Sequence, residues 1–240
     1  MKASDVQDEL QKYASDHDAL FLQRFFKTGE GQYGYGDVFI GVRVPQTRKV
    51  CNDFKDLPLT EIQKLMDSEI HEHRLAGLII MTLQYPRADE SVQQDIYDLY
   101  LKNVYKGRIN NWDLVDLSAD KIMGAHLYDQ PRDILFRLAK SEKLWERRVS
   151  ILTTFGFIKR GDPSTTIEIA EVLLHDTEDL IQKAVGWMLR EVGKRCDETI
   201  LTDFLDQHAH NMPRTALRYS IERLNPETRR HYMSLKDTVK

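Results

Sequence analysis

Cysteine is scarce in this sequence, and long apolar runs are missing from it. The two cysteines, Cys51 and Cys196, form neither a disulfide framework nor the spacing of a metal site, so the expected compartment is a reducing cytosol. No apolar run approaches the roughly 20 residues of a membrane-spanning helix, and the N-terminal segment 1–9 is too polar for a secretory signal. We therefore expect a cytoplasmic protein that does not enter a membrane.

An overall excess of positive charge is also missing. The net charge is -4 and the isoelectric point is about 6.1, which argues against a wholly basic nucleic-acid binder. Positive charge is nevertheless concentrated in residues 130–160, where eight lysines and arginines stand against three acidic residues. A run of charge is often only a solvated face, but this one is compatible with a locally basic groove.

Alternating strand patterns are absent apart from a weak one at residues 38–44, and the other segments have helical periodicity. A glycine-rich stretch, residues 27–37, contains Gly29, Gly31 and Gly34 in the spacing GxGxxG. A dinucleotide site needs a strand before this motif and a helix directly after it, and neither is predicted here. We interpret the stretch as a loop between helices that could approach a phosphate backbone.

The predicted helices contain a repeated pattern in which a basic residue precedes small and apolar residues. The basic residues are Arg74, Arg148, Lys183 and Arg214, which gives a period of about 31–37 residues. One copy is missing near residue 111, where the sequence is Asn111-Trp112-Asp113. The period predicts one all-α domain over residues 1–240, a HEAT-like helical-repeat solenoid (an α-α superhelix) with a concave binding face.

The unusual copy of the repeat, residues 111–116, is the strongest candidate for a site. Trp112 and Asp116 are four residues apart, so a helix places them on one face. Asn110 or Asn111 can cap this helix, and Asp113 would lie in its first turn. An indole beside a carboxylate suits a cationic ligand, although these six residues taken alone favour a simpler explanation, a capped helix whose tryptophan belongs to the core. The concave face should also carry Arg148, Lys183 and Trp187.

Two pairs of histidines, in His71-Glu72-His73 and in His208-Ala209-His210, were considered as metal ligands. Neither pair has the i, i+4 spacing of the HExxH motif, so we expect no metal.

Several longer runs together resemble the AlkD family of DNA alkylation repair enzymes, which are HEAT-like repeat alkylpurine DNA glycosylases. The resemblance covers essentially the whole chain and is carried by residues 39–45, 111–116, 145–148, 182–191 and 212–219. The last two of these runs are its specific part. It implies hydrolysis of the N-glycosidic bond of cationic N3- and N7-alkylated purines in duplex DNA. The family's catalytic aspartate falls on Asp116, its two lesion tryptophans on Trp112 and Trp187, and its DNA-contacting arginine on Arg148.

The chain departs from the family at two positions. Phe25 stands where a family member has a tyrosine near the DNA, and Asn111 stands where a second tryptophan can occur. Further DNA contacts are expected from six positions, namely Arg147, Lys183, Arg190, Lys194, Arg43 and Phe25. The expected partner is duplex DNA with alkylated bases, bound by a monomer without a cofactor, in a bacterial cytoplasm and on the nucleoid when DNA is bound.

Two other functions remain open from the sequence. One is a relative that binds altered DNA without excising bases, and the other is a HEAT-type scaffold for proteins. The intact set of Trp112, Asp116 and Trp187 favours the enzyme over the first, and the basic residues 130–160 favour DNA over a protein partner.

Overall fold

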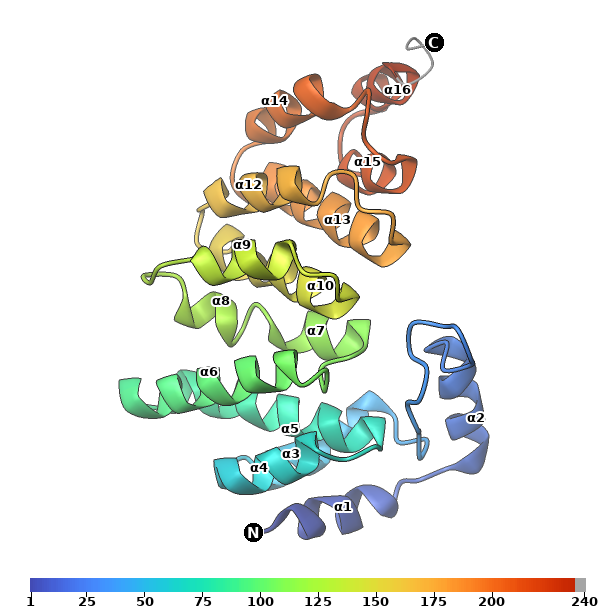
Figure 1. The fold of residues 1–240 in the computed structure, drawn as a ribbon, viewed down its shortest axis with the longest axis vertical. Helices are drawn as coiled ribbons and strands as arrows, with labels where there is room; N and C mark the ends of the chain where they lie inside the picture. The colour runs from blue at the N-terminus through green and yellow to red at the C-terminus, as the bar shows by residue number, and fades with distance from the viewer. Residues whose placement is uncertain (236–240) are drawn as a thin grey trace. The chain divides into compact units, whose positions relative to one another are not determined.

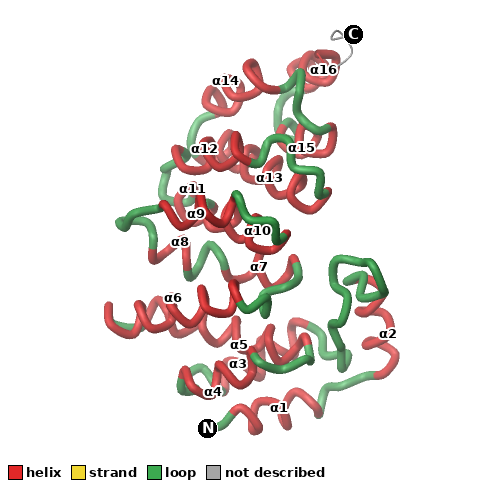
Figure 2. The backbone as a smooth tube through the Cα atoms, viewed as in Figure 1, coloured by secondary structure: helices red, strands yellow, loops and turns green. Residues whose placement is uncertain are grey.

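The computed structural model describes residues 1–235, and within them the chain is helical, with one isolated parallel bridge between Val38 and Ile70. Residue contacts divide the chain into two compact units, Met1–His126 and Leu127–Lys240. Figure 1 labels the helices of both units except the short α11, which is labelled in Figure 2 together with the loops between the helices. The all-α, helical-repeat prediction is confirmed, and the single domain stays a prediction. No described helix is long and apolar enough to span a bilayer.

The first unit is built around one buried helix, α5. The residues of α5 from His71 to Met81 are all buried, and the helix packs against α1, α3, α4 and α7. The elements of this unit are α1 (Ala3–Gln11), α2 (Asp16–Phe25), α3 (Val44–Asp53), α4 (Leu59–Met66), α5 (His71–Gln84), the 3-10 turn η1 (Tyr85–Arg87), α6 (Glu90–Tyr105), α7 (Trp112–Ser118) and α8 (Met123–His126).

The central helix of the second unit is α13, which packs against α10, α14 and α15 (Figure 1). The elements here are α9 (Asp133–Ala139), α10 (Leu144–Thr153), α11 (Phe155–Ile158), α12 (Ser164–Val172), α13 (Asp179–Arg195), α14 (Glu198–His208), α15 (Arg214–Ser220) and α16 (Pro226–Ser234). Residues 144–158 are divided between α10 and α11, with a break after Thr153. Thr153 and Thr154 hydroxyls donate to the carbonyls of Val149 and Ile151, bonds that locally compete with the helix.

Three of the repeats begin with the same small turn. The side-chain oxygen of Ser68, Ser141 or Asp176 accepts the backbone N–H two residues later. Six residues after each of them, Arg74, Arg147 or Gln182 donates back to the carbonyl of the turn residue. The equivalent residues are therefore Arg74, Arg147 and Gln182. The sequence alignment, which matched Arg74 with Arg148 and Lys183, was shifted by one residue.

Candidate functional site

Helix α7 carries the residues that the sequence singled out. Asn111 occupies the N-cap position, and its side-chain oxygen accepts the Trp112 N–H at 2.9 Å. Leu114, Val115 and Ser118 are buried, whereas Trp112, Asp113 and Asp116 are half-buried. The predicted helix and its Asn111 cap are confirmed, and Trp112 and Asp116 lie away from the buried side of α7.

Trp112 is held by phenylalanines from the end of α2. Its indole stacks on Phe26 at 5.1 Å between ring centroids, and Phe25 approaches edge-on at 5.9 Å. Phe25 is 54% exposed and Phe21 is 55% exposed, and their rings stack at 6.1 Å. No residue of α2 is buried. The indole therefore has a buried aromatic support on one side and an open aromatic margin on another.

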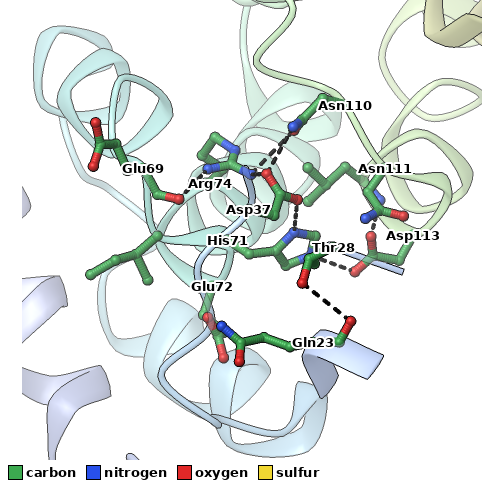
Figure 3. Close-up of polar contacts among 12 residues, drawn as sticks. Gln23, Thr28, Asp37, Glu69, His71, Glu72, Arg74, Asn110, Asn111 and Asp113 are labelled. Carbon is green, nitrogen blue, oxygen red and sulfur yellow. Dashed lines mark hydrogen bonds and ion pairs between the residues drawn. The ribbon is translucent and has the colours of Figure 1, made fainter. Parts of the chain in front are cut away.

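A buried histidine ties the first turn of α7 to the glycine-rich loop. His71, at the start of α5, pairs its Nε2 with Asp113 Oδ2 at 2.9 Å and its Nδ1 with Asp37 Oδ2 at 3.0 Å (Figure 3). The imidazole stacks on Phe39 at 4.3 Å between ring centroids. Because both ring nitrogens face carboxylates, the doubly protonated imidazolium satisfies all of these contacts.

Arg74 and Asn110 complete this network. The Arg74 Nη2 donates to Asp37 Oδ1 at 2.6 Å, and the Asn110 amide donates to the same oxygen at 2.8 Å (Figure 3). Asp37 thus accepts from three side chains at a site that is almost closed to solvent. One loop, α5 and the segment before α7 are locked together by a single carboxylate.

The charges of the network follow from this geometry. Burial lowers the pKa of His71, but Asp113 and Asp37 outweigh it and raise that pKa to about 9. Burial likewise opposes the charge of Asp37, yet its bond to His71 and the nearby Arg74 hold the pKa of Asp37 below its usual range. At neutral pH His71 is therefore a cation that engages Asp113.

The amides of residues 40–42, just after the glycine-rich loop, already hold an anion. Backbone N–H groups of Ile40, Gly41 and Val42 donate to the Glu72 carboxylate at 3.2, 2.8 and 3.1 Å. Three converging N–H groups would suit a phosphate, but here Glu72 from α5 fills the position. These three amides follow residues 27–37, so the expectation that the glycine-rich loop approaches a phosphate backbone stays a prediction.

The remaining predicted catalytic residue and the predicted DNA-contacting arginine lie in the second unit. Trp187 is half-buried on α13, with Phe155 at 5.9 Å between ring centroids. Arg148 is only 5% exposed and donates to the Leu180 carbonyl. Arg147 donates to Asp176 at 2.6 Å and to two carbonyls of the turn before α10. Both arginines are thus engaged in holding α10 and the start of α13.

Most of the other side chains that were expected to contact phosphate are already paired with acidic residues. Lys183 lies 2.6 Å from Asp179, Arg190 pairs with Glu222, and Arg43 donates two bonds to Asp18. Lys194 is exposed near the end of α13. The acids that pair with Arg190 and Arg43 are distant in sequence, whereas Asp179 precedes Lys183 by four residues on α13, a spacing that the sequence itself shows.

Sequence analysis missed the buried network itself. Its signal was visible only in part, because His71 was considered as a metal ligand and Arg74 as a repeat position. Asp37 is distant in sequence from both. Over residues 1–235 no group of three or more His, Cys, Asp or Glu side chains is arranged to hold a metal ion.

Comparisons with known proteins agree with this architecture. A family model described as DNA alkylation repair enzyme matches residues 6–224. A solved structure from Enterococcus faecalis, described as a predicted DNA alkylation repair enzyme, is similar with a TM-score of 0.69 at 16% sequence identity. The match covers 89% of this chain and 97% of that one, and at this identity it shows the fold alone. None of the curated proteins matches the chain.

Proposed function

The chain belongs to the family of DNA alkylation repair enzymes, and on that premise we propose that it is a DNA glycosylase. Its reaction is hydrolysis of the N-glycosidic bond of cationic N3- and N7-alkylated purines in duplex DNA. The observation that carries this proposal is the pair on α7, where Trp112 and Asp116 both lie on the side that is not buried. In this proposal the enzyme acts as a cytoplasmic monomer without a cofactor.

The chemistry suits this pair of residues. An alkylated purine is a cationic leaving group, and the transition state spreads positive charge over the sugar. A carboxylate about 4 Å from that charge contributes about 4 kcal/mol at an effective dielectric constant near 20. This corresponds to a rate factor of about a thousand. Asp116 supplies this stabilisation directly, and it can also orient the attacking water as a general base does.

Each tryptophan contributes less stabilisation than Asp116 does. An aromatic face attracts a cation by about 0.5–2 kcal/mol. Trp112 is held by Phe26, so its face is oriented before the substrate arrives. The resemblance assigns Trp187 the same kind of role toward a cationic base, and in this proposal the substrate's own charge replaces a snug pocket for the base.

One observation favours a second candidate, a HEAT-type protein scaffold. The ion pairs of Arg147, Lys183 and Arg190, together with the net charge of -4, leave these side chains less available to phosphates. A scaffold of this kind would bind duplex DNA no better than an ordinary acidic protein does.

The decisive test is release of 7-methylguanine and 3-methyladenine from methylated duplex DNA under single-turnover conditions. We expect Asp116→Asn to lower the rate by about a thousandfold. A matched control is Asp95→Asn, which removes the same charge from an exposed position on α6 in the same unit. The control should keep the native rate.

The other outcomes separate the alternatives. Tight duplex binding without base release by the native chain would replace the enzyme by a non-catalytic DNA-binding protein. If the native chain neither bound the duplex nor released a base, the protein scaffold would be favoured. Equal losses in the two variants would show that Asp116 contributes only to overall charge.

A further inference from the structure

Helices α15 and α16 enclose a cleft that the proposed reaction does not use. The cleft has a volume of about 510 Å³, and its lining consists of Arg218, Ile221, Pro226, Arg229, Arg230 and Met233. This volume lies within the range of roughly 300–1,000 Å³ that is usual for small-molecule sites. Three arginines and three apolar residues thus share one concave surface.

The packing of the two helices places these arginines together. On α16 the residues Pro226, Arg229, Arg230 and Met233 have the spacing i, i+3, i+4, i+7, which is one face of a helix. The helix itself is held on α15 and α14, because Arg214 donates to the Met233 carbonyl at 2.8 Å and the Tyr232 hydroxyl donates to Asp206 at 2.7 Å. Tyr232 is the buried residue of α16, and Arg229 and Arg230 lie on its exposed face beside Pro226 and Met233.

The guanidiniums of the cleft differ from the other arginines discussed above. Within the part of the chain that the structure describes, no carboxylate or carbonyl pairs with the side chain of Arg218, Arg229 or Arg230. Arg43, Arg147 and Arg190, in contrast, are each paired with an acid. Three like charges around one cleft repel each other unless an anion lies between them.

We propose that this cleft between α15 and α16 is a binding site for the phosphate backbone of DNA. Guanidinium groups bind phosphate oxygens through paired hydrogen bonds, and the apolar side chains of Ile221, Pro226 and Met233 suit the sugar beside the phosphate. DNA is the phosphorylated partner because the chain belongs to a DNA repair family. The contact reads no base sequence, and it adds affinity for the duplex independently of base excision.

The test compares glutamine substitutions that remove one charge each. The probe is a short, unmodified, fluorescein-labelled DNA duplex, and its affinity is measured by anisotropy over a series of salt concentrations. Arg218→Gln, Arg229→Gln and Arg230→Gln should each weaken binding several-fold. Each should also lower the slope of log affinity against log salt by about 0.9, the value for one lost phosphate contact. The triple variant should lower the slope by more than any single one.

Arg223→Gln is the matched control, because Arg223 is exposed in the segment between α15 and α16 and does not line the cleft. It should change the slope by less than half as much. The proposal would be overturned if all three single variants kept the native affinity and slope. It would also be overturned if Arg223→Gln lost as much affinity and slope as they do. All four positions are exposed, and a thermal melt of each variant verifies the fold.

A second titration identifies the source of the phosphate. Inorganic phosphate and deoxyadenosine monophosphate are added to the native chain and to the triple variant in a calorimeter. Binding of the free nucleotide by the native chain alone, with unchanged duplex affinity in the triple variant, would assign the cleft to a nucleotide and overturn the DNA contact. Since the duplex is undamaged, failure of base excision leaves this test unaffected.

Discussion

Gly41 is the residue whose replacement the backbone tolerates least. Its φ of +83° is in the left-handed region, and a Cβ placed there would lie 2.1 Å from the Ser15 carbonyl oxygen. Its N–H also binds Glu72. The loop therefore approaches the start of α2 at a distance that only glycine permits.

We expect Gly41→Ala to lower the free energy of unfolding by more than about 2 kcal/mol, because neither backbone can move aside without breaking the Glu72 contacts. Urea unfolding of the purified variant measures this loss. Gly31→Ala is the control, since Gly31 has a φ of +74° with nothing near its Cβ. The control should cost about 1 kcal/mol, the strain of the left-handed conformation by itself. Equal losses of unfolding free energy in the two variants would show that the contact with Ser15 does not contribute to the cost.

At the scale of elements, the contact between α5, α7 and the glycine-rich loop depends on the charge of one histidine. The pKa of His71 in the folded chain is about 9, against 6.5 as its ordinary value. A raised pKa means that the stabilisation is complete below about pH 6.5 and is lost as the pH rises through about 9.

We expect the free energy of unfolding to fall by about 3 kcal/mol across this interval, from the size of the pKa shift. His71→Gln should remove most of this pH dependence. His73→Gln is the control, because His73 lies on the same helix and burial lowers its pKa to about 4, so it carries no charge in this interval. Urea unfolding at several pH values gives the measurement. If the free energy of unfolding of His71→Gln fell with pH as much as that of the native chain, the pH dependence would belong to another group.

At the scale of the whole molecule, the open point is whether the two units unfold together. Arg147 pairs with Asp176 inside the second unit, and both side chains are largely buried. Arg147→Ala leaves that carboxylate buried without its cation, at a cost of about 3 kcal/mol.

Hydrogen exchange resolved by residue shows where this cost is felt. If residues 1–240 form the single domain that the sequence predicts, the slowest amides of both units should lose protection to a similar extent. Loss confined to the unit that begins at Leu127 would contradict the single domain. Lys194→Ala is the control, since Lys194 is exposed and its removal should leave protection unchanged throughout.

Much of the local structure was predictable from the sequence. The periodicity predicted that the chain is helical, and a cap by Asn110 or Asn111 at the start of α7 was expected because asparagine side chains satisfy the first amides of a helix. The short helix α8 and the C-terminal α16 were missed. In α16 the Asn225-Pro226 start is a clear signal, but the polar segment that follows has little apolar periodicity.

The sequence by itself determined the all-helical class, the repeating character and the candidate residues Trp112 and Asp116, because these depend on periodicity and on spacing within one helix. Only the tertiary structure decided the partners of the charged residues. Asp37 meets His71 and Arg74 across more than thirty positions of the chain, and Asp176 binds Arg147 from a following turn. The arginines of α15 and α16 share one cleft without partners. Composition and spacing count charges, whereas the energy of a charge depends on what lies within a few ångströms of it after the chain has folded.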